Sequence, residues 1–551
     1  MRRPVRAMPR LVVALGVTVV LGGTPSVAAP AAAARPVGAA VPRPETTRQI
    51  DWHGCAGNGP DTVGTALDTA GAECAELEVP LDHRRPAGPT ISIAISRIKA
   101  ADDAGRRGVL FLNPGGPGVS GLDMPLLVKH SSPAVAAAYD LIGFDPRFTG
   151  RSTPIDCTWP VSTSLRSAGP TKATYQQSVV LARRLAALCA DQKAVLPYAS
   201  TRNAARDLDV VRAALGEAKV SYLGYSYGTY LGAVYLQLFG SRVDRIVLDS
   251  NIDPTAFGPS LFARSGPAMQ AALKNWAGWA ARHDGTYRLG TNVKQVLANV
   301  ELVRKSVDKR PLRVGDYTVD THVLPLLLWV GSDSVSALTE ESALLEVLRD
   351  AATGKRATPT KALADALDFI GGPAGSPVIG AQTTVLCADR AAASNTADYL
   401  KDIDRRRRTE PIFGPLTRNI TPCAFWPTKP LENPTRIRNA HPVLMLNATG
   451  DTQTPLVGAL VLHQALTASH LVTLRGAYRH GVFLTGGSGC ADRTVERYLV
   501  DGVLPSGDIT CVTDRTTALP SFPLRDQAIR GDQAIHDRVT RPDHMFESIW
   551  P

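Results

Sequence analysis

The residue pattern with the clearest chemistry is a G-x-S-x-G pentapeptide at residues 224–228. An apolar run, 220–223, precedes it, and a helix-like run, 229–238, follows it. Strand, pentapeptide and helix in this order are typical of a nucleophile elbow, a tight turn that pushes a serine oxygen out of the sheet. Such a turn brings backbone segments close together, which favours its two glycines. A chance match is the alternative in a chain with 47 glycines, but the flanking elements favour Ser226 as a nucleophile.

An acid and a histidine follow two later strand-like runs. Asp451 comes after 442–447, and His480 comes after 471–474. Serine, acid and histidine in this chain order are typical of α/β-hydrolases. We expect His480 to take the serine proton and Asp451 to orient the imidazole. Asp145 and Asp249 also follow strand-like runs and are the alternative acids. Asp145 is better explained as a residue that orders a loop beside Arg147, so Asp249 is the second choice.

A glycine-rich loop follows the strand-like run 108–112. Its glycines at 116, 118 and 121 match the dinucleotide fingerprint G-x-G-x-x-G, which makes a dinucleotide oxidoreductase one hypothesis. Two prolines in the loop remove N–H groups that such a site needs. We therefore favour an oxyanion loop, in which the N–H of Gly115 or Gly116 acts with the N–H of Tyr227 on the developing negative oxygen.

The elements around these residues alternate between strands and helices up to Asp249, which predicts a mainly parallel sheet covered on both faces. From 254 to 440 helical periodicity dominates, with predicted helices at 269–282, 293–307 and 337–352. The sheet pattern returns at 442. The sequence therefore predicts an α/β-hydrolase fold with an inserted helical cap.

The predicted organisation has six parts, whose boundaries follow from these patterns and from the two termini. They are a signal peptide (1–28), a linker or pro-segment (29–45), the first part of the core (46–253), the helical cap (254–440), the second part of the core (441–515) and a C-terminal tail (516–551).

The N-terminus is typical of a secretory signal. Four arginines precede an apolar run, 11–22, and small residues at 26–28 form a cleavage site. The run is too short to span a bilayer, and no later stretch is long and apolar enough for a membrane helix. We expect a secreted, extracellular protein.

Eight cysteines in a secreted chain predict four disulfides. Eight cysteines allow 105 pairings, and we predict that neighbours in the sequence pair. The predicted pairs are Cys55 with Cys74, Cys157 with Cys189, Cys387 with Cys423, and Cys490 with Cys511. Because the chain has no C-x-x-C and no His/Cys cluster at zinc spacing, we expect no metal site and no cofactor.

The net charge of +10 includes the four N-terminal arginines. No basic cluster is interleaved with aromatic residues, so the sequence gives little support for nucleic-acid binding. We expect a monomer that acts on small or peptide substrates.

Several stretches across residues 50 to 512 resemble the secreted tripeptidyl aminopeptidases of actinomycetes, α/β-hydrolases related to proline iminopeptidases. The matching stretches are 79–82, 113–118, 143–147, 222–230, 423–427, 451–455 and 501–505. The resemblance implies a serine exopeptidase that removes short peptides, of the tripeptidyl type, from free N-termini, with the catalytic residues assigned above.

The chain departs from the family pattern at three places. Phe148 stands where the family usually has a glycine after Asp-Pro-Arg. The family usually has Asp-Gly where this chain has Asp249-Ser250, so Ser250 replaces the glycine. The family's histidine loop is commonly Gly-x-Gly-His-Gly, whereas residues 477–481 are Ala-Tyr-Arg-His-Gly.

An aminopeptidase must hold a free α-ammonium group, and a charge removed from water needs a partner. Candidate partners are Glu340 and Glu341 in the cap and Asp389 beside Cys387; the alternative is that each is a surface or helix-end acid. Two other functions remain open for this fold: an esterase or amidase acting on small metabolites, and a non-catalytic binding protein.

Overall fold

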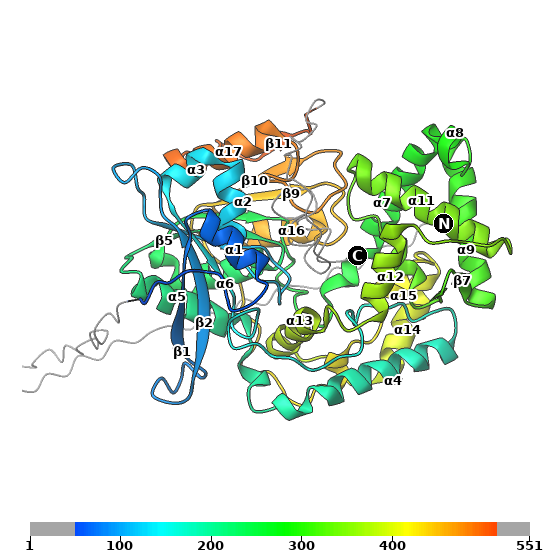
Figure 1. Ribbon diagram of the computed structural model, residues 1–551, viewed down its shortest axis with the longest axis horizontal. Helices are drawn as coiled ribbons and strands as arrows, with labels where there is room; N and C mark the ends of the chain where they lie inside the picture. Colours follow the sequence, from blue (N-terminus) through cyan, green and yellow to red (C-terminus); the bar gives the residue numbers. More distant parts are fainter. Residues whose placement is uncertain (1–49, 515–551) are drawn as a thin grey trace, which may run out of the picture. The chain divides into compact units, whose positions relative to one another are not determined.

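The computed structural model describes residues 50–514 (Figure 1). Residues 50–514 belong to one compact unit. The predicted signal peptide, linker and C-terminal tail lie outside the described residues. Within 50–514, every helix is too short or too polar to cross a membrane.

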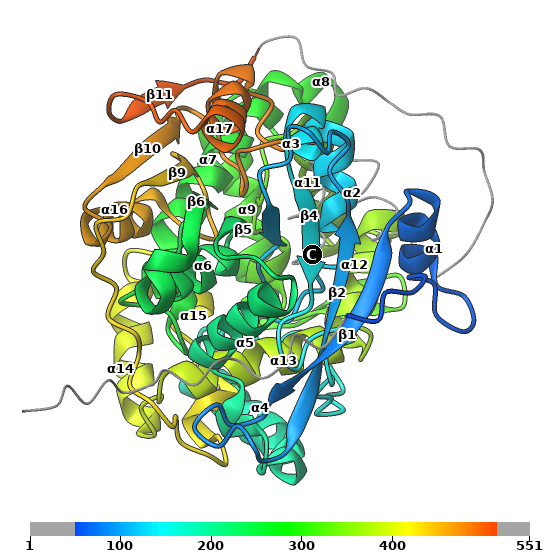
Figure 2. The same ribbon diagram turned by 90° about the vertical axis from the view of Figure 1, so that its left-hand side faces the viewer.

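A nine-stranded sheet forms the core, and Figure 2 shows its strands from β1 at one edge to β11 at the other. The first two strands pair antiparallel, as do β2 and β4, and all other neighbours are parallel. The predicted mainly parallel sheet is thus confirmed. In spatial order the strands are β1 (Glu73–Pro80), β2 (Thr90–Ile98), β4 (Asp140–Phe144), β3 (Val109–Asn113), β5 (Val220–Tyr225), β6 (Val243–Asp249), β9 (Val443–Ala448), β10 (Ser469–Leu474) and β11 (Ile509–Cys511).

The central strands are apolar on both faces because helices cover both. In β3, Phe111 packs into one hydrophobic cluster while Leu110 and Leu112 pack into another. In β9, Met445 packs into the first of these clusters and Leu444 into the second. This alternation follows from the two-residue period of a strand, and it explains why these runs are apolar throughout.

Helices flank the sheet in two groups, one packed into each cluster. α5 illustrates why they form: the Ser200 side chain accepts from the Asn203 N–H at its N-terminus, and Ala204, Leu208 and Val211 share its buried face. One group is α1 (Thr62–Thr69), α2 (Met124–Ser131), α3 (Pro133–Ala138) and α17 (Gly489–Asp501), and the other is α5 (Thr201–Ala214), α6 (Tyr227–Phe239) and α16 (Leu456–Ala465).

The segment between β6 and β9 is mainly helical and lies beside the sheet in Figure 1. Its core is a separate hydrophobic cluster around Trp276 and Leu345. Its elements are α7 (Gly266–Arg282), α8 (Asp284–Tyr287), α9 (Val293–Lys309), β7 (Leu312–Val314), β8 (Tyr317–Val319), α10 (Leu324–Leu327), α11 (Val335–Ala352), α12 (Lys361–Gly371), α13 (Ser376–Asp389), α14 (Thr396–Arg407) and α15 (Gly414–Thr417). We call this segment the cap.

One helix from the first half of the chain also packs with the cap. α4 (Lys172–Leu188) lies between β4 and β5 in the sequence, yet its Tyr175 and Val179 share a cluster with Ile403 of α14. Figure 1 shows α4 and α14 close together, below the cap helices α12 and α15. The cap therefore packs against a helix from the first half of the chain.

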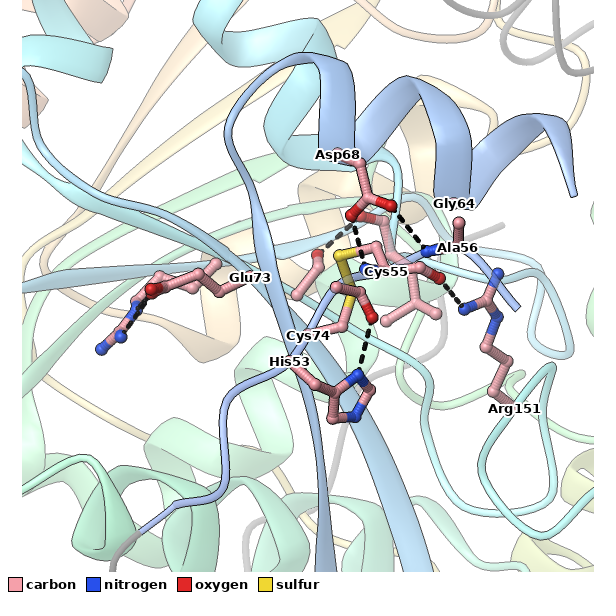
Figure 3. The surroundings of a disulfide bond; sticks show 12 residues. His53, Cys55, Ala56, Gly64, Asp68, Glu73, Cys74 and Arg151 are labelled. Atoms are coloured by element: carbon pink, nitrogen blue, oxygen red, sulfur yellow. Dashed lines mark hydrogen bonds and ion pairs between the residues drawn. A yellow bond between two sulfur atoms is a disulfide. The ribbon is translucent and has the colours of Figure 1, made fainter. Parts of the chain in front are cut away.

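The four predicted disulfides are all present: Cys55–Cys74, Cys157–Cys189, Cys387–Cys423 and Cys490–Cys511. Figure 3 shows the first, which fastens the chain before α1 to β1. Asp68 accepts the N–H groups of Cys55 and Ala56, and Arg151 donates to the Cys55 carbonyl at 2.6 Å. The disulfide thus belongs to a hydrogen-bonded corner at the sheet edge.

Candidate active site

Five loops leave adjacent parallel strands at the same edge of the sheet. They follow β3, β5, β6, β9 and β10, which are neighbours in that order. The carboxyl ends of parallel strands form the edge where open α/β sheets bind ligands. The predicted oxyanion loop, nucleophile, acid and histidine all lie on these loops.

Ser226 joins β5 to α6 with an unusual backbone. Its φ is 54° and its ψ is −119°, a strained conformation of the kind that clusters at functional sites. A Cβ on Gly224 would lie 2.6 Å from the Gly228 carbonyl oxygen, and a Cβ on Gly228 would lie 2.8 Å from Asn113 Oδ1. Both glycines of the pentapeptide are therefore required by close backbone approach.

Asp451 and His480 are hydrogen-bonded. Asp451 Oδ2 lies 2.8 Å from His480 Nδ1, and both side chains are buried. The other oxygen, Oδ1, accepts the N–H groups of Gln453 and Thr454, while the Thr454 hydroxyl donates to Oδ2. These contacts keep the carboxylate facing the imidazole, and they assign Nδ1 as the protonated nitrogen because it faces an anion.

Asp249 links the serine turn to the histidine loop. Its backbone carbonyl accepts the Ser226 N–H at 2.9 Å, and its carboxylate accepts the N–H groups of Val482 and Phe483. Asp249 thus holds the backbone at Ser226 and the backbone just after His480. Burial raises the pKa of Asp249 to about 7, and these hydrogen bonds oppose the rise.

The two candidate acids therefore have different contacts. Asp451 bonds to the imidazole itself, whereas Asp249 holds the loop that carries it. Ser250 extends the second arrangement: its hydroxyl lies 3.1 Å from Asp249 Oδ1 and accepts the Gly481 N–H at 2.7 Å. The φ of Ser250 is 60°, in the left-handed region that favours glycine. A glycine would adopt this conformation more easily, but it would lack the hydroxyl that accepts the hydrogen bond from the histidine loop.

Gly115 does not offer its N–H to a substrate. That N–H donates to Asn113 Oδ1 at 3.0 Å, which corrects the prediction that Gly115 could be an oxyanion donor. Its role is to leave space, because a Cβ there would lie 2.8 Å from the Ser226 Cβ. Gly116 and Tyr227 remain the candidates. The Tyr227 N–H, in the first turn of α6, has no intrahelical acceptor.

Asp145 orders the far end of the oxyanion loop. Its Oδ1 accepts from the Ser120 hydroxyl at 2.6 Å and from the Gly121 N–H at 2.9 Å. Burial raises its pKa to about 6. Arg147, two residues later, instead forms a two-pronged ion pair with Asp207. Asp145 therefore orders a loop, as expected from the sequence, but its partners are in the oxyanion loop and Arg147 is not among them.

The three candidate amine-binding acids have different environments. Glu340 is exposed. Glu341 is buried, its Oε1 has no hydrogen-bond partner among the described residues, and burial raises its pKa to about 8. Both oxygens of Asp389 accept hydrogen bonds from Thr201, from its N–H at 2.8 Å and from its hydroxyl. Asp389 thus joins α13 to the start of α5, whereas Glu341 is buried with an oxygen that has no partner in the part of the chain that the structure describes.

A cavity of about 310 Å³ opens elsewhere, beside α4, and is lined in part by Arg166, His322 and Asn419. None of the residues discussed above lines it. The candidate catalytic residues are on the loops at the sheet edge and not beside this cavity. Between residues 50 and 514, no group of three acidic, histidine or cysteine side chains could hold a metal ion.

The sequence is similar to known hydrolases over most of its length. Residues 410–511 match the model of the family described as TAP-like protein. A tripeptidyl aminopeptidase from Streptomyces lividans is 34% identical over 501 residues, covering 87% of this chain and 90% of the relative. The serine protease Hip1 of Mycobacterium tuberculosis is 30% identical, covering 85% and 92%. A carboxylesterase B of the same species is 31% identical, covering 89% and 96%.

These relatives support a serine peptidase of the α/β-hydrolase type, in agreement with the sheet order and with a strained serine between β5 and α6. The chain belongs to the tripeptidyl aminopeptidase family of α/β-hydrolases.

Proposed function

We propose that this protein is a secreted serine aminopeptidase that releases tripeptides from the free N-termini of peptides. Ser226, His480 and Asp451 are its catalytic residues. The observation that carries the proposal is the role of Asp249, whose carbonyl holds the Ser226 N–H while its carboxylate holds the loop that follows His480. The tripeptide length comes from the name of the Streptomyces relatives.

The mechanism begins with attack by Ser226 Oγ on the carbonyl carbon of the third peptide bond. His480 Nε2 takes the hydroxyl proton, and Asp451 stabilises the imidazolium through the Nδ1–H bond. The N–H groups of Gly116 and Tyr227 hold the oxyanion, each contributing about 3 kcal/mol to lowering the barrier. His480 then protonates the departing amine, and water hydrolyses the tripeptidyl ester.

Glu341 is the residue that we assign to the substrate's α-ammonium group. It is a buried carboxyl group with an oxygen that lacks a partner, and a buried carboxyl group gains most from an incoming cation. An ammonium ion beside it lowers its pKa and forms the ion pair that the free protein lacks. Glu340 and Asp389 remain weaker candidates because one is exposed and the other bonds to Thr201.

Secretion is supported by the four disulfides, which persist in oxidising compartments. Treatment of the secreted protein with a thiol-alkylating reagent before and after reduction tests this point. We expect no alkylation before reduction and modification of all eight cysteines after it. Alkylation of the native protein would contradict the oxidised state.

An esterase acting on small acyl esters is the second candidate, and similarity to a carboxylesterase B favours it. Tripeptide anilides with a free amine and their N-acetylated forms separate the two functions. An aminopeptidase cleaves the free form and loses that activity on acetylation. Turnover of small acyl esters, without cleavage of either anilide, would favour the esterase.

Labelling with a fluorophosphonate tests the nucleophile itself. We expect Ser226→Ala to abolish labelling and Ser260→Ala, at an exposed serine, to leave it unchanged. Mass spectrometry of products from a mixed peptide pool then gives the length of the released peptide. Release of single residues or dipeptides would contradict the tripeptide assignment.

A further inference from the structure

The histidine loop is held from the cap side as well as from the core. Asp333, in the cap, accepts the Tyr478 N–H at 2.9 Å through Oδ2. Its Oδ1 accepts from Arg479 Nε at 2.6 Å, and Arg479 Nη2 contacts the same oxygen. The two residues before His480 thus both bond to one carboxylate of the cap.

This ion pair is shielded from solvent. The side chains of Arg479 and Asp333 are 18% and 17% exposed, so water and salt screen the pair less than they screen a surface pair. Arg479 has a second contact within its own loop, from Nη1 to the Thr485 carbonyl at 3.4 Å. The arginine therefore ties the loop to the cap at a defined position.

A second contact joins the same cap segment to the loop of the acid. Trp329 Nε1 donates to Thr452 Oγ1 at 2.8 Å, and both residues are buried. Tyr478 packs against the hydrophobic cluster of the cap, and a Cβ on Gly450 would lie 2.4 Å from its ring. Cap residues 329–333 therefore contact both loops that carry the His480–Asp451 pair.

The contacts from cap and core flank His480 in the sequence. On its C-terminal side, Ser250 and Asp249 accept the N–H groups of Gly481, Val482 and Phe483. On its N-terminal side, the corresponding acceptor is Asp333. The imidazole therefore sits between a support from the sheet and a support from the cap.

We propose that Asp333 and Arg479 are positioning residues that couple the cap to the catalytic base, so that displacement of the cap moves His480 relative to Ser226. The inference rests on the proposed function of the triad and concerns this chain's own loop, because Arg479 stands where the resembling family commonly has glycine. The cap thereby acts on the chemical step and not only on substrate access.

The test compares Asp333→Asn, Arg479→Gln and the double variant with the wild type. Asn retains an acceptor for the Tyr478 N–H but removes the charge. We expect each single variant to slow fluorophosphonate labelling and kcat for a tripeptide anilide by about tenfold, because small misplacements of a base are costly. KM stays within about twofold, and the double variant is no slower than either single variant because both remove one interaction.

Glu301→Gln is the matched control, because it removes charge from an ion pair with Arg304 on α9, within the cap but away from the histidine loop. It leaves the labelling rate unchanged. If Asp333→Asn does not fold, Arg479→Gln tests the same ion pair from the core side. Labelling at the wild-type rate in the folded variants, or a rise in KM alone, would overturn the coupling.

A proton NMR readout separates this inference from the proposed function. The proton between His480 Nδ1 and Asp451 gives a resonance far downfield, which is observable without turnover. We expect Asp333→Asn to shift or broaden it, and Glu301→Gln to leave it in place. A shift in a protein that cleaves no peptide would support the coupling while the aminopeptidase assignment fails, and an unchanged resonance would overturn the coupling.

Discussion

Buried carboxyl groups at the strand ends of the core and Glu341 in the cap are in opposite situations, although another buried acid of the cap, Asp389, is hydrogen-bonded to Thr201. At the ends of the core strands, Asp451, Asp249 and Asp145 accept hydrogen bonds from backbone N–H groups or hydroxyls of the catalytic loops. In the cap, Glu341 is equally buried, yet one of its oxygens has no partner among the described residues. The three core acids are held by hydrogen bonds, whereas Glu341 Oε1 has no partner among the described residues. The comparison supports our proposal that the acids at the sheet edge serve catalysis and that Glu341 serves recognition of the substrate.

Loss of the nucleophile is the largest effect that we expect on the core side. Ser226→Ala should lower kcat by about 10⁶-fold, the size of effect found for a triad serine. Alanine removes only the hydroxyl, so the melting temperature should change little. Active-site labelling together with calorimetry measures both quantities. Residual activity above one per cent would place the nucleophile elsewhere.

Asp451→Asn should have the next largest effect. The asparagine amide cannot stabilise an imidazolium, and it favours the wrong tautomer of His480, which costs about 10⁴-fold in kcat. Steady-state kinetics on a tripeptide anilide gives the number. Similar losses from Asp451→Asn and Asp249→Asn would remove the distinction between the acid that bonds to the imidazole and the acid that holds its loop.

The sequence predicts secondary structure in both the core and the cap. The helices expected at 269–282, 293–307 and 337–352 are α7, α9 and α11, and the elbow and the strands before the acid and the histidine likewise follow from short runs of residues. The disulfides join cysteines 19 to 36 residues apart, and their pairing is expected only from the order of the cysteines in the sequence. Helix α4 (Lys172–Leu188) shows the limit of such patterns, because its packing on α14 depends on a contact with Ile403, over two hundred residues away.

Site residues were missed for the same physical reason. Nothing in the spacing of Asn113 shows that its side chain takes the Gly115 N–H, since the bond depends on the curvature of the loop. The contact between Asp333 and Arg479 likewise joins positions 146 residues apart. Alternating and helical periodicity indicate which residues are buried. The hydrogen bond of Asn113 depends instead on the curvature of its loop, and the contact of Asp333 with Arg479 depends on how the cap packs on the sheet edge.

Asp249→Asn sharpens the comparison within the core. We expect a loss of about 10- to 100-fold in kcat, smaller than for Asp451→Asn, because the amide keeps one acceptor for Val482 and Phe483 while its NH₂ group opposes the other N–H. The variant should also unfold at a lower temperature than the wild type. Thermal unfolding and kinetics measured on the same preparation test both, and full activity would show that the histidine loop does not need this support.

Glu341→Gln should have the smallest effect on the reaction, and it tests the proposed role of the cap in binding the substrate. The folded-state pKa of about 8 lies above the ordinary value of 4.5. The protonated acid is thus the form that folding favours, so its contribution to stability is full below pH 4.5 and is lost as the pH rises to 8. The loss is about 1.4 kcal/mol per pH unit in that window. Glutamine does not titrate, so the variant should be more stable than the wild type at pH 8 and should show a weaker dependence of unfolding on pH.

The same variant should raise KM for tripeptide anilides with a free amine by about tenfold, since it removes a charge-assisted contact. It should leave the turnover of small acyl esters unaffected. The free energy of unfolding at pH 5 and pH 8, measured beside KM, distinguishes two roles. A stability change without a change in KM would make Glu341 a buried acid of the cap with no part in recognition, and the division between a catalytic core and a recognising cap would then have to rest on other residues.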